Sequence, residues 1–161
     1  MKTLYLVRHA KSSWEFDIDD HQRPLSERGL NDAPKVAKYI KDKIELPQKV
    51  MSSDAMRAKT TALLYLKELD IPERELVLEH KLYDFSGKGL DSVIRNCDDS
   101  IDRLMIFGHN HAMTAMVNEY GDKSIDNVST AAFTAIEFEA SNWKDIQDGR
   151  TKLYVKPKQL K

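Results

Sequence analysis

The sequence has little cysteine, no excess of one charge and no long apolar segment. Cys97 is the only cysteine, so an intrachain disulfide and a cysteine-rich metal site are both excluded. The 25 Lys and Arg residues nearly balance the 26 Asp and Glu residues, which gives no bulk attraction to nucleic acid or to an anionic membrane surface. No stretch approaches the roughly 18 apolar residues of a membrane-spanning helix. We therefore expect neither a nucleic-acid nor a membrane partner.

The sequence also shows no feature typical of a domain boundary or of a targeting signal. We find no repeat, low-complexity tract or linker in the 161 residues, which predicts a single domain over 1–161. Only a few apolar residues lie between Lys2 and Arg8, so the N-terminus does not resemble a signal peptide. We expect a cytoplasmic protein, and the sequence gives no indication of its oligomeric state.

Short apolar segments alternate with segments of helical periodicity. The runs 3–7, 49–52, 76–78 and 103–107 are short and mostly apolar, as buried strands are. Helical spacing of apolar residues predicts helices from 26 to about 44, from 53 to 69, over 90–94 and over 112–120. The last two strands, 133–138 and 152–155, are predicted to pair as an edge hairpin. The alternation predicts an α/β three-layer sandwich, with a mainly parallel central sheet and helices on both faces.

Four residues mark the predicted helices more closely. Ser26 and Ser53 are expected N-caps, because a serine hydroxyl accepts a hydrogen bond from the free amides of a first helical turn. Gly121 is expected to close the helix over 112–120. Pro34 lies inside the first helical pattern and has no amide hydrogen, so we expect a kink or a break there.

Polar residues follow three of the predicted strands. Arg8 and His9 follow the first strand, Ser53 the second and His109 the fourth. Ligands of α/β proteins bind beyond the carboxyl ends of parallel strands, so these side chains should lie close together. Arg57 falls in the first turn of the helix after Ser53, where the amides and the helix dipole favour an anion.

Two guanidiniums and two imidazoles form a set suited to a dianionic phosphoryl group. Arginine offers planar, paired donors to phosphate oxygens. A neutral imidazole can attack phosphorus while the surrounding cations stabilise the charge in transit. No metal and no cofactor is required, because the arginines neutralise that charge. Chemistry alone does not choose between His9 and His109 as the nucleophile.

The same residues belong to a series of motifs in a fixed order. They are Leu6-Val7-Arg8-His9-Ala10-Lys11-Ser12-Ser13-Trp14, Arg23-Pro24-Leu25-Ser26-Glu27-Arg28-Gly29, Ser52-Ser53-Asp54-Ala55-Met56-Arg57-Ala58-Lys59-Thr60-Thr61-Ala62, Leu82-Tyr83 and Gly108-His109-Asn110. With this set the sequence resembles the histidine phosphatase superfamily, and within it the short phosphohistidine phosphatase (SixA-like) branch. The resemblance implies that His9 is the nucleophile and that Arg8, Arg57 and His109 bind the phosphoryl group.

Two departures from larger family members shape the expected substrate. Only about fifty residues separate Arg57 from His109, which leaves no room for the lid insertion of those members and implies an open site. The acid that would protonate the leaving group has no certain counterpart; Asp84 is the best candidate by its spacing after Leu82, and the alternative is a solvated turn residue. Without an acid, the substrate needs a good leaving group, and phosphohistidine has one.

Several residues near the motifs carry weaker expectations. Ser12 and Lys11 lie in the loop that should surround the phosphate and are candidate phosphate contacts. Arg23 is expected to pair with an acid near that loop or to hold the substrate. Glu15 replaces an asparagine that some members use for phosphate, which argues against mutase-type substrates. No metal is expected at His111, which lacks a third ligand at suitable spacing. His21 and His80 are expected to be surface residues.

The leading hypothesis is a metal-independent phosphatase that acts on phosphohistidine in proteins or on small phosphoesters. Its partner would be a phosphorylated protein or a small phosphorylated molecule. Two alternatives stay open: a sugar-phosphate phosphatase or phosphomutase, and a phosphate-binding module that has lost catalysis.

Overall fold

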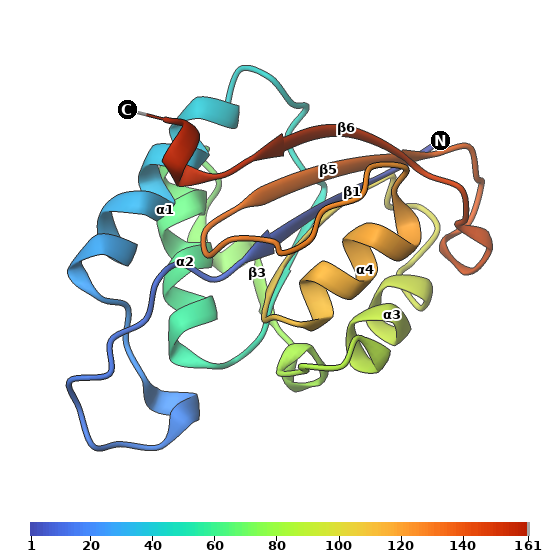
Figure 1. Ribbon diagram of the computed structural model, residues 1–161. Coiled ribbons are helices and arrows are strands. Elements are labelled where there is room, and N and C mark those ends of the chain that lie inside the picture. Colours follow the sequence, from blue (N-terminus) through green and yellow to red (C-terminus); the bar gives the residue numbers. More distant parts are fainter. Residues whose placement is uncertain (161) are drawn as a thin grey trace.

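A six-stranded sheet forms the centre of the computed structural model, which describes residues 1–160 (Figure 1). Its strand order is β3-β2-β4-β1-β5-β6. The strands are β1 (Lys2–Arg8), β2 (Lys49–Ser52), β3 (Leu76–Leu78), β4 (Arg103–Gly108), β5 (Phe133–Phe138) and β6 (Arg150–Val155). The first four are mutually parallel, whereas β5 and β6 form an antiparallel edge hairpin. The prediction of a mainly parallel sheet ending in a hairpin is thus confirmed.

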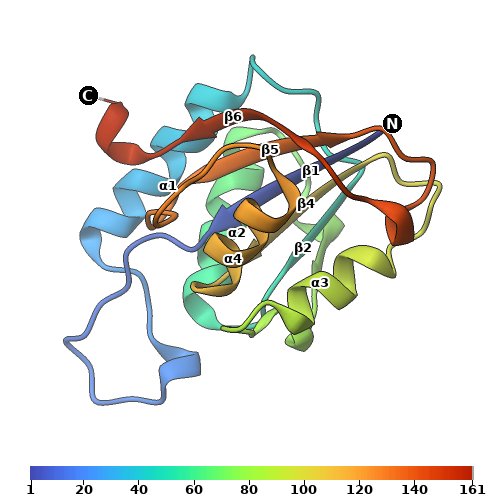
Figure 2. The same ribbon diagram turned by 45° about the vertical axis from the view of Figure 1, so that its right-hand side comes forward.

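Helices cover both faces of this sheet, as predicted. They are α1 (Glu27–Ile40), α2 (Met56–Glu68), α3 (Lys88–Arg95) and α4 (Ala112–Tyr120). The helices α1 and α2 lie on one side of the sheet, and α3 and α4 lie on the other (Figures 1 and 2). No helix within residues 1–160 is long and apolar enough to cross a membrane.

The alternation of side chains along β4 shows why both faces are covered. Leu104 and Ile106 belong to the core under α3 and α4, whereas Met105 and Phe107 belong to the core under α1 and α2. All four are fully buried. Successive side chains of a strand point to opposite faces, so a continuous apolar run of this kind requires a layer on each side.

The strand register brings three carboxyl ends to one edge of the sheet. Arg8 at the end of β1 pairs with Gly108 at the end of β4, and Ser52 at the end of β2 pairs with Phe107. Two single-turn 3-10 helices, η1 (Asp20–Gln22) and η3 (His80–Leu82), lie beyond this same edge. The other 3-10 helices are η2 (Glu73–Glu75), η4 (Trp143–Asp145) and η5 (Pro157–Gln159). The three polar strand ends are therefore neighbours, as the sequence predicted.

Of the four residues singled out in the predicted helices, Ser26 and Gly121 act as expected, whereas Ser53 and Pro34 differ. Ser26 is the N-cap of α1, and its hydroxyl accepts a hydrogen bond from the amide of Gly29. Gly121 closes α4. The prediction for Ser53 is wrong, because α2 begins two residues later with Ala55 as its N-cap. Of the kink or break expected at Pro34, the break does not occur; α1 runs through this residue, and the strong apolar face that α1 buries outweighs the lost hydrogen bond.

Candidate active site

A cavity of about 330 Å³ opens at the carboxyl ends of β1, β2 and β4. Twelve residues line it: Arg8, His9, Lys11, Ser12, Trp14, Asp20, Arg23, Arg57, Phe85, His109, Asn110 and Thr130. All four residues predicted to converge are among them, as are Ser12 and Lys11. A larger cavity of about 560 Å³ lies at the opposite end of β1, beside Thr3 and Tyr5. It holds none of the predicted site residues, so we place the chemistry in the smaller one.

The ring of His9 presents one defined nitrogen to this cavity. Its Nδ1 atom lies 2.7 Å from the carbonyl oxygen of Ala10. A carbonyl only accepts, so Nδ1 carries the hydrogen and Nε2 keeps its lone pair. Burial lowers the pKa of His9 to about 3, and the charges of Arg57 and Arg8 add to this effect. The imidazole is therefore neutral at pH 7, with Nε2 free to act as a nucleophile.

His109 lies beside His9, with 5.2 Å between the ring centroids. Its Nε2 atom is 2.9 Å from the hydroxyl oxygen of Ser53, which also accepts a hydrogen bond from the amide of Ala55. Burial lowers the pKa of His109 to about 3, with further lowering from His9 and Arg57. Ser53 thus holds the second imidazole in place, a role that its expected function as a helix cap did not foresee.

The two arginines enter from different elements. Arg8 is the last residue of β1, and its Nη1 atom donates to the carbonyl oxygen of Val128 at 2.8 Å. Arg57 lies in the first turn of α2 and is 2 % exposed. The Nε atoms of both arginines and Nδ1 of His109 are buried without a hydrogen-bond partner among the described residues. Unpaired buried polar atoms are uncommon in folded proteins, and their concentration here is typical of a functional site.

The Arg-Pro-Leu-Ser motif fixes the loop that carries Lys11 and Ser12. The amide and the hydroxyl of Ser26 both donate to the carbonyl oxygen of Lys11, at 2.8 and 3.0 Å. Arg23 donates through Nη1 to the hydroxyl of Ser12. Arg23 also pairs with Asp20 through Nη2 at 3.0 Å. Arg23 thus pairs with a nearby acid, which is one of the two roles expected for it. Ser12 is buried at the cavity wall, and Lys11 lines the same cavity but is exposed.

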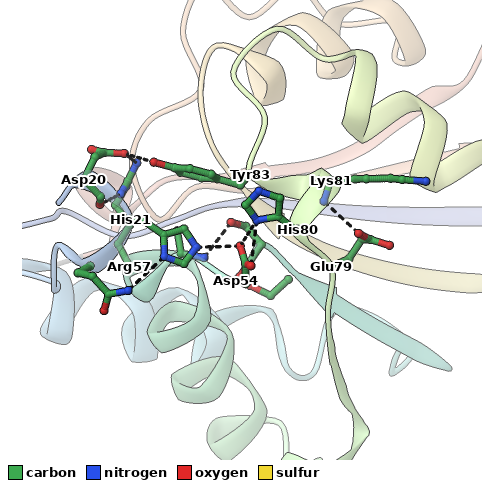
Figure 3. A network of polar contacts seen from close by, with 12 residues as sticks. Asp20, His21, Asp54, Arg57, Glu79, His80, Lys81 and Tyr83 are labelled. Atoms are coloured by element: carbon green, nitrogen blue, oxygen red, sulfur yellow. Dashed lines mark hydrogen bonds and ion pairs between the residues drawn. The ribbon is translucent and has the colours of Figure 1, made fainter.

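Asp20 is the site residue that the sequence did not reveal. Its carboxylate lies 3.0 Å from Nη2 of Arg57 and accepts a hydrogen bond of 2.6 Å from the hydroxyl of Tyr83 (Figure 3). Burial alone would raise the pKa of Asp20, but the hydrogen bonds from Tyr83, Arg57 and Arg23 hold it far below its usual range. An ionised carboxylate thus lies on the guanidiniums of Arg57 and Arg23 at the wall of the cavity. Only the loop conformation, with Asp20 on the single turn η1, places it there.

Asp84, the candidate acid, does not line the cavity. Its carboxylate accepts hydrogen bonds from the amides of Ser86, Gly87 and Leu90 at the start of α3. Burial opposes ionisation, but these amide hydrogen bonds prevail and lower the pKa of Asp84. A carboxylate that is ionised and turned toward a helix N-terminus is a cap, so the structure argues against Asp84 as a proton donor.

The mouth of the cavity is open and partly aromatic. Trp14 is 75 % exposed and stacks on Arg23, whose guanidinium carbon lies 3.6 Å from the ring centroid. Phe85 is 47 % exposed and packs near His109. Between α2 and β4 the chain forms only η2, β3, η3 and α3, and α3 packs on the sheet through Leu90 and Ile94. Within residues 1–160 the expectation of no lid insertion is confirmed.

Comparison with known proteins agrees with this geometry. The model of the histidine phosphatase superfamily (branch 1) matches residues 4–103. A chloroplast protein of Arabidopsis thaliana, itself uncharacterised, is 28 % identical over 153 residues, which cover 89 % of this chain and 70 % of the relative.

Two solved structures have the same fold. The protein histidine phosphatase SixA, solved with tungstate, superposes with a TM-score of 0.79 at 17 % identity and covers 99 % of both chains. A protein of Agrobacterium tumefaciens, provisionally assigned as the phosphohistidine phosphatase SixA, superposes with a TM-score of 0.80 at 22 % identity, over 96 % of this chain and 97 % of that one.

Proposed function

This chain is a phosphatase of the histidine phosphatase superfamily, and on that premise we propose that it hydrolyses phosphohistidine through a covalent phosphoryl group on His9. The observation that carries the proposal is the state of the His9 ring. The ring is neutral, its Nδ1 hydrogen is bound to the Ala10 carbonyl, and its Nε2 lone pair borders a cavity that also holds Arg8 and Arg57.

The reaction proceeds in two displacements. In the first, the lone pair of His9 Nε2 forms a bond to phosphorus while the bond from phosphorus to the leaving atom breaks, and its electron pair stays with the leaving group. In the second, the oxygen of a water molecule forms a bond to phosphorus while the bond to Nε2 breaks and its electron pair returns to Nε2. The phosphate leaves with both protons of the water, and the neutral imidazole is restored. Arg8 and Arg57 neutralise the phosphoryl oxygens in both steps, and His109 contributes a further donor. Nothing in these steps routes through a metal ion.

Neither carboxyl group near the site is both protonated and directed at the cavity, as a proton donor to the leaving group would have to be. Asp20 borders the cavity but is ionised, and Asp84 is turned toward α3. Phosphohistidine suits such a site, because an imidazole nitrogen leaves with less help than an alkoxide does. The open, partly aromatic mouth formed by Trp14 and Phe85 leaves room for a protein surface that carries the phosphohistidine. The proposed partner is thus a phosphorylated protein, with small phosphoesters as weaker substrates.

Covalent trapping tests the mechanism directly. The full chain is mixed with a phosphohistidine peptide, quenched, and examined by intact mass and peptide mapping. We expect one acid-labile phosphoryl group on the peptide that carries His9, and the rate should not fall when a chelator is added. His9→Ala should lower kcat by at least about 10⁴-fold while the protein still binds tungstate. An adduct on His109, or turnover by His9→Ala, would overturn the proposed nucleophile.

Leaving-group dependence tests the substrate class. Rates for a series of aryl and alkyl phosphates should rise steeply as the leaving alcohol becomes more acidic, and phosphohistidine should exceed phosphoserine by orders of magnitude. A flat series would show that some group protonates the leaving oxygen. Binding of tungstate without any turnover would instead favour the phosphate-binding module.

A further inference from the structure

Three side chains from separate loops meet beside the active-site cavity. They are His21 on η1, Asp54 in the turn between β2 and α2, and His80 on η3 (Figure 3). Nε2 of His21 lies 2.9 Å from one carboxylate oxygen of Asp54, and Nδ1 of His80 lies 2.9 Å from the other. We propose that these residues bind a divalent metal of the zinc class, and that the bound metal keeps Asp20 in the phosphoryl pocket.

The donor set is the first reason for this assignment. Two imidazole nitrogens and one carboxylate oxygen form a set that binds Zn²⁺ and chemically similar cations such as Co²⁺ and Ni²⁺, with further positions left to water. The side chain of His80 is 73 % exposed, and those of His21 and Asp54 are about 30 % exposed. A metal ion can therefore reach the three ligands from solvent without opening the fold.

The spacing is the second reason. One ligand atom from each residue lies within 4.8 Å of the others. Bonds of about 2.0–2.1 Å in a tetrahedral zinc site place ligand atoms roughly 3.3 Å apart. Oδ1 of Asp54 lies 2.9 Å from Nε2 of His21 and 3.1 Å from Nδ1 of His80, close to this spacing, so the main adjustment is for the two imidazoles to approach each other. The exposed ring of His80 can make that adjustment by rotation.

Gln22 supplies a partner for the far side of the His21 ring. Its amide nitrogen lies 3.3 Å from Nδ1 of His21. When a metal takes Nε2, the ring hydrogen must move to Nδ1, and a half-turn of the Gln22 amide then presents its oxygen as the acceptor. Zinc-bound histidines characteristically donate their second nitrogen to such a group. The ring of Tyr83 packs edge-on against His21 at 5.0 Å and limits its rotation.

The link to the active site is the peptide bond between Asp20 and His21. The carboxylate of Asp20 lies on Arg57, which the proposed reaction uses to neutralise the phosphoryl oxygens, and on the neighbouring Arg23. A metal that joins His21 to Asp54 and His80 fixes η1 and so holds this carboxylate in place. Metal and oxyanion should therefore oppose each other, and by linkage each should weaken the other by the same factor.

Metal titration tests the site without any measurement of turnover, so its outcome is independent of the proposed function. Full-length protein without a histidine tag is stripped with a chelator and titrated with Co²⁺, whose visible absorption reports tetrahedral binding, and then with Zn²⁺ by calorimetry. We expect one metal per chain. His80→Ala and Asp54→Asn should each weaken binding by at least about tenfold.

Two control variants separate this site from other histidines. His111→Ala removes an exposed histidine outside the cluster, and His9→Ala removes one of the paired cavity imidazoles; both should bind the metal like the parent. Equal affinity in the parent and in His80→Ala, or loss of binding in His9→Ala, would overturn the site.

Tungstate binding tests the coupling to Asp20. Zn²⁺ should raise the Kd of tungstate in the parent protein, and tungstate should raise the Kd of Zn²⁺ by an equal factor. In Asp20→Asn, Zn²⁺ should still bind, but tungstate affinity should no longer respond to it. A tungstate Kd in the parent that is unchanged by saturating Zn²⁺ would overturn the proposed effect on Asp20.

Discussion

At the scale of single residues, one threonine connects the proposed nucleophile to the arginine across the pocket. The hydroxyl of Thr61 accepts a hydrogen bond from the amide of Ala10 at 2.9 Å and donates to the carbonyl of Arg57 at 2.7 Å. The carbonyl of the same Ala10 fixes the Nδ1 hydrogen of His9. Thr61 is fully buried. The threonine of the Arg-Ala-x-x-Thr-Ala motif therefore sets the position of His9 without touching the substrate.

Thr61→Val keeps the shape of the side chain and removes both hydrogen bonds. The Ala10 amide is then buried without a partner, which should lower the free energy of unfolding by about 1–3 kcal/mol. We also expect kcat to fall, because the peptide that orients His9 is less well fixed. Urea unfolding and steady-state kinetics measure the two effects. Thr61→Ser should restore both, and Thr60→Val should change neither; a Thr61→Val protein as stable and active as the parent would contradict this role.

At the scale of elements, helix α1 packs its first turn against the cavity loop that carries Lys11 and Ser12. A Cβ atom at Gly29 would lie 2.2 Å from the carbonyl oxygen of Lys11 and 3.0 Å from its amide nitrogen. Both are backbone atoms, so a side chain cannot be accommodated by rotation of a neighbour. The glycine of the motif is required by this close approach of helix and loop, since its position inside α1 demands no unusual backbone angle.

Whether Gly29→Ala raises or lowers the free energy of unfolding tests this close packing. In an unobstructed helix this change stabilises by up to about 1 kcal/mol. Here we expect a loss of about 1–3 kcal/mol, because the loop of Lys11 must move away. Tungstate should also bind more weakly, since the same loop lines the cavity. Calorimetric titration and thermal unfolding measure both, with Asn31→Ala on the exposed side of α1 as the control. An increase in stability would refute the packing argument.

The elements also show which parts of the site could be predicted. The convergence of Arg8, His9 and His109 followed from the sequence, because parallel strands end at a shared sheet edge whatever the loops do. Asp20 could not be found in this way, since its place depends on the path of a polar loop without apolar periodicity. The same holds for the cluster of His21 and His80 with Asp54, since the sequence predicted only that the two histidines are surface residues. Local propensity also misplaced the cap at Ser53, because its hydroxyl is bound to a histidine 56 residues away.

At the scale of the whole molecule, the two cavity histidines make folding sensitive to acid. Burial lowers the pKa of both His9 and His109 to about 3, against about 6.5 in the unfolded chain. Between these values the unfolded chain binds more protons than the folded one. The free energy of unfolding should therefore be highest above about pH 6.5. It should fall as the pH drops toward 3, by at most about 1.4 kcal/mol per pH unit for each histidine.

Urea unfolding at pH 7, 6 and 5 checks this pH dependence. His9→Asn should reduce the slope of unfolding free energy against pH, because only one buried imidazole then resists protonation. His111→Asn is the matched control, since His111 is exposed, and its slope should equal that of the parent. Identical slopes in His9→Asn and the parent would show that the buried imidazoles do not govern the acid sensitivity.

The position of β1 between β4 and β5 has a consequence for how such a protein can diversify. Arg8 and His9 leave the central strand of a sheet buried on both faces, whereas Trp14 and Phe85 project from exposed loops at the mouth. A change in the loops costs little stability, while a change at the strand end costs much. During evolution, substitutions in these loops can therefore change which substrate is recognised, while the residues at the strand end and the reaction itself stay the same.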